Sequence, residues 1–455
     1  MAKPSIPKGT RDFGSVQMSR RNYIFNTIKE SFLNYGFAQI ETPSMENLQT
    51  LTGKYGDEGD KLIFKILNSG DYLKKANAEA LANRDSAELV SSISEKALRY
   101  DLTVPFARYV VQHQHELSFP FRRFQIQPVW RADRPQRGRY REFYQCDADI
   151  IGSDSLLFEV ELIQLFDEVL SKLNIPDFTI KLNNRKVLTG IAEVCGETER
   201  LVDITVALDK LDKIGEDGVV KEWQARGVSE EAIARLKPLF SLTGDFSHQL
   251  TQLKDILADS TVGGEGLKEL AFIVDTIGSL GLKQAKLEFD VTLARGLNYY
   301  TGAIFEVKAN GVKMGSICGG GRYADLTGVF GLPNMSGVGI SFGADRIYDV
   351  LEELSLFPES VEQGTQVLLI NFGVQEAVHA LSLLKELRAN GISAEIYPDA
   401  VKLKKQMKYA NDKGIPHVLM LGDEEIKNKT VSHKNMESGE QAPKSLDHFI
   451  YEIKQ

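Results

Sequence analysis

The stretch from Phe124 to Gly152, FQIQPVWRADRPQRGRYREFYQCDADIIG, has the pattern of a strand, a turn rich in arginine and proline, and a returning strand. Side chains alternate between the two faces of a strand. Two paired strands can therefore bring together the side chains of Arg131, Phe143, Gln145 and Asp149. An arginine can hold a phosphate through two parallel hydrogen bonds, and an aromatic ring can stack on a purine. The stretch predicts nucleotide binding; a charged hairpin around a buried phenylalanine is the structural alternative.

The charge pattern around this stretch runs opposite to that of the whole chain. The 455 residues are 42% hydrophobic and 26% charged, with a net charge of −9. This is the balance of a soluble globular protein of about two to four domains, and it argues against one that coats nucleic acid nonspecifically. Residues 122–142 nevertheless hold seven arginines against Asp133 and Glu142. A concentrated arginine segment favours an enzyme that handles phosphate, or a selective RNA reader, over a solvated face that mixes lysine and glutamate.

Targeting and metal signals are absent from the sequence pattern. No run approaches the roughly 18–20 apolar residues that cross a bilayer, and the basic, proline-bearing start lacks a signal peptide's apolar stretch, so we expect a cytoplasmic protein. The three cysteines lie too far apart for a disulfide framework or a zinc site. His113 and His115 form a His-x-His pair, which is either a metal fragment or an exposed helix end. We expect no metal site.

Hydrophobic periodicity divides the chain into three parts. Strands and amphipathic helices over residues 1–185 and 281–354 predict an antiparallel α+β domain. Residues 186–280 have an almost wholly helical pattern and predict an inserted helical domain. After a boundary near 355–364, residues 365–455 alternate strand and helix, which predicts a small α/β domain with a parallel sheet. Within the first part, the polar, alanine-rich stretch 70–96 predicts an inserted helix or a mobile loop.

Two further stretches carry candidate chemistry. Leu293 to Gly302, LARGLNYYTG, has the pattern of two strands around a turn, in which the tyrosines could simply pack. Gly337 to Ile347, GVGISFGADRI, has glycines that let a strand approach a ligand or another backbone. Its third glycine is one place late for a dinucleotide-binding fingerprint, which would also leave Arg346 unexplained.

Taken together, these stretches resemble the signatures of class II aminoacyl-tRNA synthetases. The 124–152 stretch is similar to the second signature, through Arg131-x-Asp133, Arg139-x-x-x-Phe143 and Asp147, and 337–347 to the third. Phe37 to Glu46, FAQIETPSME, resembles the first signature, used for dimerisation. The 295–302 segment, RGLNYYTG, closely resembles the motif specific to histidyl-tRNA synthetases. Arg99 to Arg108, RYDLTVPFAR, resembles that family's amino-acid-binding segment in a variant form, and the resemblance extends over the whole chain except residues 70–96.

The resemblance implies a fold and a reaction. The fold would be α+β: a class II synthetase antiparallel sheet core with a helical insertion, and a C-terminal α/β anticodon-binding domain. The reaction would activate histidine with ATP, release pyrophosphate, and transfer histidine to the 3′ end of its tRNA. The implied partners are L-histidine, ATP with Mg²⁺, tRNA(His) and a second copy of the chain, without DNA or membrane.

The resemblance also implies roles for individual residues. Arg295 and Arg131 would be catalytic, at the α-phosphate. The histidine-binding residues would be Asp101, Thr103 and Gln145 at the α-amino group, and Asp149, Tyr299 and Tyr300 at the imidazole. The ATP-binding residues would be Arg131, Arg139, Phe143 and Arg346. The tRNA acceptor end would meet Arg134, Gln136 and Arg137 of the arginine-rich turn. Lys402, Lys404, Lys405 and Lys408 either contact the anticodon arm or form a solvated helix face.

Two rivals share parts of this pattern. A histidine-binding regulatory paralogue would resemble the catalytic part but would lack the C-terminal domain and often the key arginines. Another class II synthetase, such as one for proline or threonine, would share the C-terminal domain type. Residues 365–455 argue against the first rival, and the segment 295–302 argues against the second.

Overall fold

The computed structural model describes residues 3–294, 300–362 and 364–454. The chain divides into two compact units, one of residues 1–12 and 21–357 and the other of residues 13–20 and 358–455. Each unit has its own hydrophobic core. The larger unit contains the segments that resemble the synthetase signatures. None of the helices in the described part of the chain is long and apolar enough to cross a membrane.

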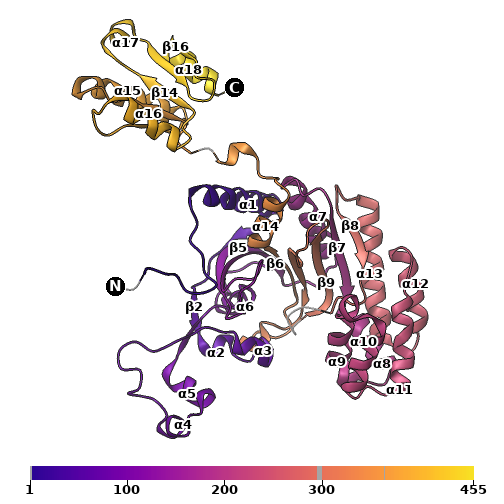
Figure 1. Ribbon diagram of the computed structural model, residues 1–455. Coiled ribbons are helices and arrows are strands. Elements are labelled where there is room, and N and C mark those ends of the chain that lie inside the picture. The colour runs from indigo at the N-terminus through magenta and orange to yellow at the C-terminus, as the bar shows by residue number, and fades with distance from the viewer. Residues whose placement is uncertain (1–2, 295–299, 363, 455) are drawn as a thin grey trace. The chain divides into compact units, whose positions relative to one another are not determined.

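An eight-stranded sheet lies at the centre of the larger unit (Figure 1). Its strands, in spatial order, are β1 (Ala38–Gln39), β5 (Phe121–Trp130), β6 (Glu142–Ile151), β11 (Gly337–Gly343), β10 (Cys318–Tyr323), β9 (Tyr300–Ala309), β7 (Phe178–Asn184) and β8 (Lys286–Phe289). Only the two outermost pairs, β1–β5 and β7–β8, are parallel. The sheet is thus largely antiparallel, as the α+β prediction requires. Strand β7 was not among the strands expected from the sequence.

The hairpin of β5 and β6, which the opening stretch of sequence predicted, is paired over ten residues of each strand. Phe121 pairs with Ile151 at one end and Trp130 with Glu142 at the other. On β6, Cys146, Ala148 and Ile150 belong to the hydrophobic core. Because successive side chains point to opposite faces, the intervening polar residues point away from that core.

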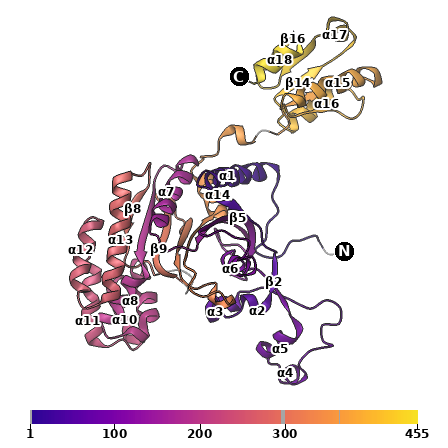
Figure 2. The same ribbon diagram turned by 180° about the vertical axis from the view of Figure 1, so that it is seen from behind.

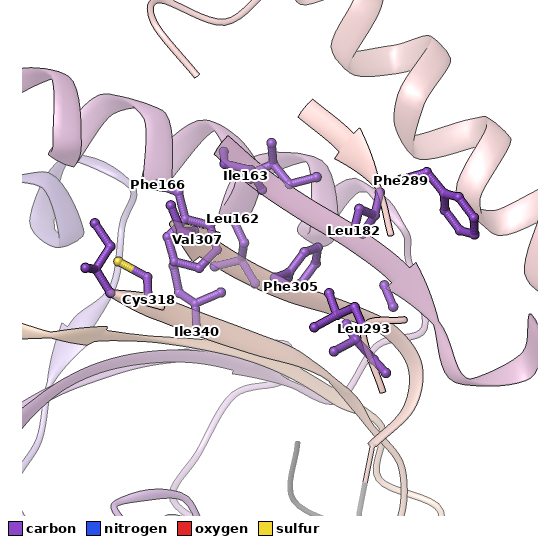
Figure 3. Packing of buried hydrophobic residues seen from close by; sticks show 14 of the residues in the cluster. Leu162, Ile163, Phe166, Leu182, Phe289, Leu293, Phe305, Val307, Cys318 and Ile340 are labelled. Carbon is purple, nitrogen blue, oxygen red and sulfur yellow. The ribbon is translucent and has the colours of Figure 1, made fainter. Parts of the chain in front are cut away.

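Three helices cover the apolar side of the sheet: α1 (Ser15–Asn34), α7 (Leu157–Lys172) and α14 (Ala344–Glu353). Figure 3 shows side chains of α7 packed on those of the central strands. The ring of Phe166 lies 5.3 Å from that of Phe342 on β11 and 6.3 Å from that of Phe305 on β9. Neighbouring strands in the middle of the sheet leave no room for a side chain at Gly320, the middle glycine of the triple glycine in β10. A Cβ there would lie 2.2 Å from the Gly339 carbonyl oxygen.

The helical stretch after β7 belongs to the same hydrophobic core as the sheet. It comprises α8 (Arg185–Val194), η1 (Thr198–Arg200), α9 (Leu201–Leu208), α10 (Leu211–Ala225), α11 (Glu230–Leu236), η2 (Lys237–Ser241), α12 (Phe246–Ile256) and α13 (Thr261–Leu280). Polar side chains cap several of these helices at their N-termini, among them Asn184, Ser229, Asp245 and Ser260. Such caps satisfy backbone N–H groups that have no partner inside the helix.

A small three-stranded sheet, in the order β2–β4–β3, stands beside the large one. This lobe comprises β2 (Met45–Asn47), α2 (Leu48–Leu51), α3 (Gly56–Lys61), β3 (Lys65–Ile66), α4 (Ala78–Asn83), α5 (Ser86–Ile93), β4 (Lys96–Leu98) and α6 (Thr103–Gln112). The stretch 70–96 therefore contains two short helices, capped by Asn77 and Asp85. In Figures 1 and 2, α4 and α5 form the tip of the lobe, away from the large sheet.

The smaller unit is a five-stranded sheet covered by helices. The strand order is β13 (Ala394–Ile396), β12 (Val367–Leu369), β14 (His417–Met420), β15 (Val431–Asn435) and β16 (Gln441–Lys444). The helices are α15 (Val374–Ala389), α16 (Leu403–Asp412), α17 (Asp423–Asn428) and α18 (Leu446–Ile453). Residues of α15 and α18 share one hydrophobic cluster, whereas α16 contributes to another.

The prediction of a parallel sheet in this unit is wrong for two of the five strands. Strands β13, β12 and β14 are parallel, but β15 and β16 are antiparallel to their neighbours. A parallel crossover needs roughly a dozen or more connecting residues. The short connection from Met420 to Val431 contains only the one-and-a-half-turn helix α17, so the chain returns in the opposite direction.

We expect Phe166→Ala to lower the free energy of unfolding of the larger unit by about 3–5 kcal/mol, because it leaves a cavity between α7 and the sheet. Both tryptophans, Trp130 and Trp223, lie in that unit, so their fluorescence during urea unfolding reports on it. The matched control is Leu157→Ala in the same helix, where the side chain is 55% exposed and the expected change is within about 0.5 kcal/mol. Equal losses in the two variants would contradict the packing described for α7.

Candidate active site

A cavity opens on the polar side of the large sheet. Its lining comes from the start of α6, from β5–β6 and from β9, β10 and β11: Asp101, Thr103, Arg131, Gln145, Asp147, Asp149, Tyr300, Gly319, Gly320, Tyr323, Gly339, Ile340 and Ser341. The six described residues that the sequence analysis assigned to histidine or to the α-phosphate are all among them; Arg295 and Tyr299 lie outside the described residues. The structure thus brings together residues from five separate stretches of sequence.

Asp101 lies directly before α6 and is 1% exposed. Its Oδ1 accepts hydrogen bonds from the Tyr55 hydroxyl at 2.8 Å and from the Val104 N–H at 3.1 Å. Its Oδ2 is buried and has no hydrogen-bond partner among the described residues. Burial raises the pKa of this carboxyl, whereas the hydrogen bond from Tyr55 lowers it. The carboxyl is therefore held in place by one oxygen and has the other available to a ligand.

Asp149 forms a buried ion pair with Arg123 of β5. The distance from Arg123 Nη2 to Asp149 Oδ2 is 2.7 Å, and the two side chains are 0% and 3% exposed. The Tyr323 hydroxyl donates to Asp149 Oδ1 at 2.9 Å, and the Arg123 guanidinium lies 4.1 Å from the centre of the Phe106 ring. Burial raises the pKa of Asp149, and the charge of Arg123 opposes that shift. Both oxygens of Asp149 thus have an internal donor, and each keeps a second lone pair for a ligand.

Asp147 is a cavity residue to which the sequence analysis gave no role beyond its place in the motif. It lies on β6 between Gln145 and Asp149, pairs in register with Ser341 of β11, and is 2% exposed. The strand period of two provides the signal that could have found it, because residues 145, 147 and 149 share one face. Arg123, Tyr323 and Tyr55 were also missed. No local pattern distinguishes them: Tyr323 lines the cavity from β10, and Arg123 and Tyr55 contact Asp149 and Asp101 across long distances in sequence.

Arg131 is fixed between two aromatic rings at the cavity. Its guanidinium lies 4.3 Å from the centre of the Tyr100 ring and 5.2 Å from that of Phe143. Its Nε donates to the Tyr100 carbonyl oxygen at 3.0 Å. The remaining guanidinium N–H groups are in position to bind an anion, and the ring of Phe143 lies beside that place. The structure therefore sets the expected phosphate ligand next to the expected purine platform.

The other two expected phosphate ligands differ in how firmly they are held. Arg346, on α14, donates from Nε to the Gly138 carbonyl oxygen at 2.9 Å and from Nη1 to that of Ser316 at 2.5 Å. Arg139 is 49% exposed, and its Nη1 lies 3.7 Å from an oxygen of Asp133. Neither residue lines the cavity itself. Arg346 supports the arginine-rich turn, and the half-exposed Arg139 side chain extends from the same turn.

The arginine-rich turn is rigid at its base and exposed at its tip. Gln136 and Arg139 exchange two backbone hydrogen bonds, of 3.1 Å and 2.9 Å, and the Arg141 N–H donates to the Gly9 carbonyl oxygen at 2.8 Å. The side chains of Arg134, Gln136 and Arg137 are exposed, and Arg137 forms an ion pair with Glu353 at 2.5 Å. These three residues thus present polar groups to solvent from a fixed backbone.

The segment 295–299, with the expected Arg295 and Tyr299, lies outside the described residues. The residues on either side of it form contacts that the structure describes. Asn183, which is 0% exposed, donates its side-chain N–H groups to the carbonyl oxygens of Val291 at 3.3 Å and Leu293 at 3.0 Å. On the other side, Tyr300 begins β9 and lines the cavity. Among the described residues, no group of three histidine, cysteine or acidic side chains could hold a metal ion.

Comparisons with known proteins agree with one another. Residues 71–347 match the family model described as histidyl-tRNA synthetase, and residues 366–455 match that of an anticodon binding domain. The chain is 64% identical over 441 residues to a histidine–tRNA ligase of Christiangramia forsetii, covering 97% of each chain. It is 62% identical over 449 residues to one of Bacteroides fragilis, covering 99% of this chain and 98% of the relative.

Solved structures extend the likeness to the whole fold. A histidyl-tRNA synthetase from Nostoc sp. PCC 7120 superposes with a TM-score of 0.83 at 30% identity, covering 100% of this chain and 99% of that one. A Bacillus halodurans chain described as an ATP phosphoribosyltransferase regulatory subunit/histidyl-tRNA synthetase shares the fold, with a TM-score of 0.73 at 22% identity. The family-model match and the full-length relatives lead to one conclusion: this chain belongs to the histidyl-tRNA synthetase family.

Proposed function

We propose that this protein is a histidine–tRNA ligase that forms histidyl-adenylate from L-histidine and ATP and then transfers histidine to the 3′ end of tRNA(His). The observation that carries the proposal is the cavity in which buried acids lie next to Arg131 and Phe143. Buried acids suit the donor-rich amino acid, and an arginine beside an aromatic ring suits the phosphate and the base of ATP. Full-length relatives that are histidine–tRNA ligases support the same activity.

In the first step, a carboxylate oxygen of histidine attacks the α-phosphorus of ATP, and the bond to the bridging oxygen of pyrophosphate breaks. This chemistry depends on positioning and on neutralising charge rather than on a protein nucleophile. Arg131, held by the Tyr100 carbonyl, would bind the α-phosphate, together with Arg295. Arg139 and Arg346 would bind the distal phosphates, with Phe143 on the adenine. Mg²⁺ would enter with ATP, coordinated mainly by phosphate oxygens and water.

The histidine substrate would occupy the acidic part of the cavity. Asp101, Thr103 and Gln145 would receive its α-amino group; Asp149, Tyr299 and Tyr300 would bind the imidazole. The support for this orientation is the ion pair of Asp149 with Arg123, which fixes an ionised acceptor deep in the cavity. A site built from buried hydrogen-bonding groups rejects analogues that cannot satisfy them.

In the second step, a hydroxyl of the terminal tRNA adenosine attacks the carbonyl carbon of the adenylate, and AMP leaves. Arg134, Gln136 and Arg137 would contact the acceptor end, because their exposed side chains extend from a fixed turn. The unit of residues 358–455 would bind the anticodon. The exposed lysines of the α16 region would neutralise phosphates of the tRNA backbone there: Lys402, Lys404, Lys405 and Lys408. We further propose a cytoplasmic homodimer, through the segment 37–46.

The first test is pyrophosphate exchange into ATP with each of the twenty amino acids. We expect exchange with histidine and background rates with the others, since the cavity is lined by acceptors for the amine and the imidazole. Exchange with a different amino acid alone would refute the substrate. Histidine binding without exchange would favour the regulatory paralogue.

The second test concerns Arg131. We expect Arg131→Ala to lower kcat for histidine-dependent exchange roughly a hundred- to a thousandfold, the usual loss when one positioned transition-state donor is removed. The control is Arg235→Ala, which removes an exposed arginine that pairs with Glu231 on the helical insertion; its rate should equal that of the wild type. A similarly small loss of kcat in both variants would show that Arg131 has no role in catalysis.

A further inference from the structure

Asp147 is the buried carboxylate of the cavity that the proposed mechanism does not use. Its strand is central in the sheet, and it faces Gln125 of β5 on one side and Ser341 of β11 on the other. Only 2% of the residue is exposed, and it lines the cavity together with its strand neighbours Gln145 and Asp149. A buried carboxylate is costly unless its oxygens are hydrogen-bonded, so a partner for each oxygen is expected.

The structure leaves one oxygen of Asp147 without such a partner. Asp147 Oδ1 is buried and accepts no hydrogen bond from any described residue. The charge of Arg123 lowers the pKa of Asp147, but its Nη2 pairs with Asp149, and its buried Nε and Nη1 form no hydrogen bond to a described residue. The Gln125 side-chain N–H groups donate to Thr42 at 3.1 Å and to Gln127 at 2.8 Å. Asp147 Oδ1 thus faces the cavity region without a donor from the described residues around it.

Two other cavity residues also have a buried acceptor atom without a hydrogen-bond partner. Asp101 Oδ2 and Gln145 Oε1 are also buried and lack a partner among the described residues. Of the residues that line the cavity, these two and Asp147 are the ones with such an atom. A protonated primary amine has three N–H donors and one positive charge. Three acceptors match that group in number, and the two on carboxylates have the opposite sign of charge.

We propose that Asp147 is a further substrate-binding residue, which accepts the third N–H of the α-ammonium group alongside Asp101 and Gln145. The inference rests on the proposed function, because it takes histidine as the ligand of this cavity. Asp147 then determines specificity for a free α-amino group, whereas Asp149 serves the imidazole. Loss of the Asp147 charge lowers the affinity for every ligand that has the amine and leaves the affinity for ligands without it unchanged.

The electrostatic surroundings of Asp147 make its role depend on pH. The pKa of Asp147 is raised to about 7, mainly by burial; Arg123 and the Ser341 hydroxyl oppose this rise, and the charges of Asp149 and Asp101 add to it. Arg131 is the cation among the residues that line the cavity. The carboxylate is the better acceptor and carries the charge that the ammonium needs. Histidine binding should therefore strengthen as the pH rises through about 7, over the range in which Asp147 loses its proton.

The test compares Asp147→Asn, which removes the charge, with Asp147→Ala, which also removes the oxygen. Calorimetric titrations would use histidine, histidinol, which keeps the amine but lacks the carboxylate, and imidazolepropionate, which lacks the amine. We expect both variants to bind histidine and histidinol roughly ten- to a hundredfold more weakly, as for the loss of a charge-assisted hydrogen bond. Imidazolepropionate should bind within about twofold of the wild type.

Controls separate a binding role from a structural one. Asp154→Asn changes an exposed carboxylate just beyond the same strand and should leave all three affinities unchanged. The wild-type KM for histidine should fall as the pH rises through about 7, and the fall should be smaller in Asp147→Asn, although the substrate imidazole titrates equally in both. Imidazolepropionate has the same titrating ring without the amine, so in the wild type the affinity for histidine should increase more steeply through about pH 7 than the affinity for imidazolepropionate. This comparison keeps the inference testable even where a variant folds poorly.

Each remaining outcome overturns the inference. Wild-type affinity for histidine in both variants would show that Asp147 does not contact the substrate. An equal loss of affinity for all three ligands would mean that Asp147 supports the structure of the cavity or contacts the imidazole ring. The same conclusion would follow if the pH profile of the KM for histidine were the same in Asp147→Asn and in the wild type. Either result leaves histidine-dependent exchange in the wild type intact, whereas failure of that exchange would reject the proposed function itself.

Discussion

The antiparallel pairing of β5 with β6 is the constraint on which both the core and the cavity depend. Its ten-residue register places Cys146, Ala148 and Ile150 in the hydrophobic core and turns Gln145, Asp147 and Asp149 to the opposite side. Because the side-chain period is two, a slip of one residue would exchange these sets. It would bury three polar groups under α7 and expose the apolar ones to the cavity. The hydrophobic effect that stabilises the sheet therefore also fixes the positions of the polar groups.

Those polar groups are held at a cost to stability. Burial raises the pKa of Asp101, Asp147 and Asp149, so each binds its proton more tightly in the folded chain than in the unfolded one. For Asp147, the contribution to stability therefore declines as the pH rises from the unfolded value of about 4 towards 7. Arg123 offsets part of this cost at Asp149. Acceptors without internal donors are what a binding site for a cationic amine requires.

The arginines of the larger unit show how one residue type serves two purposes. Arg123 and Arg322 are buried against carboxylates, Arg322 on Glu159 of α7, and their role is to satisfy interior charge. Arg131 and Arg346 are instead anchored by hydrogen bonds to backbone carbonyl oxygens. A guanidinium held in this way is positioned for a polyphosphate. The proposed ATP ligands and the structural arginines thus differ in partner, although they are indistinguishable in composition.

Sequence alone was sufficient for the α+β class, the family and the hairpin of β5 and β6, because these depend on local periodicity and on motifs of contiguous residues. It was also sufficient to name six of the thirteen residues that line the cavity through resemblance; the roles of those residues, and of Arg295 and Tyr299, stay predictions. Only the tertiary structure revealed that Tyr55 supports Asp101, that Arg123 pairs with Asp149, and that Asp147 has an oxygen without a donor. It also decided the antiparallel course of β15. These facts depend on which segments, far apart in the sequence, come into contact, and on which buried groups already have a hydrogen-bond partner. A local sequence pattern contains neither kind of information.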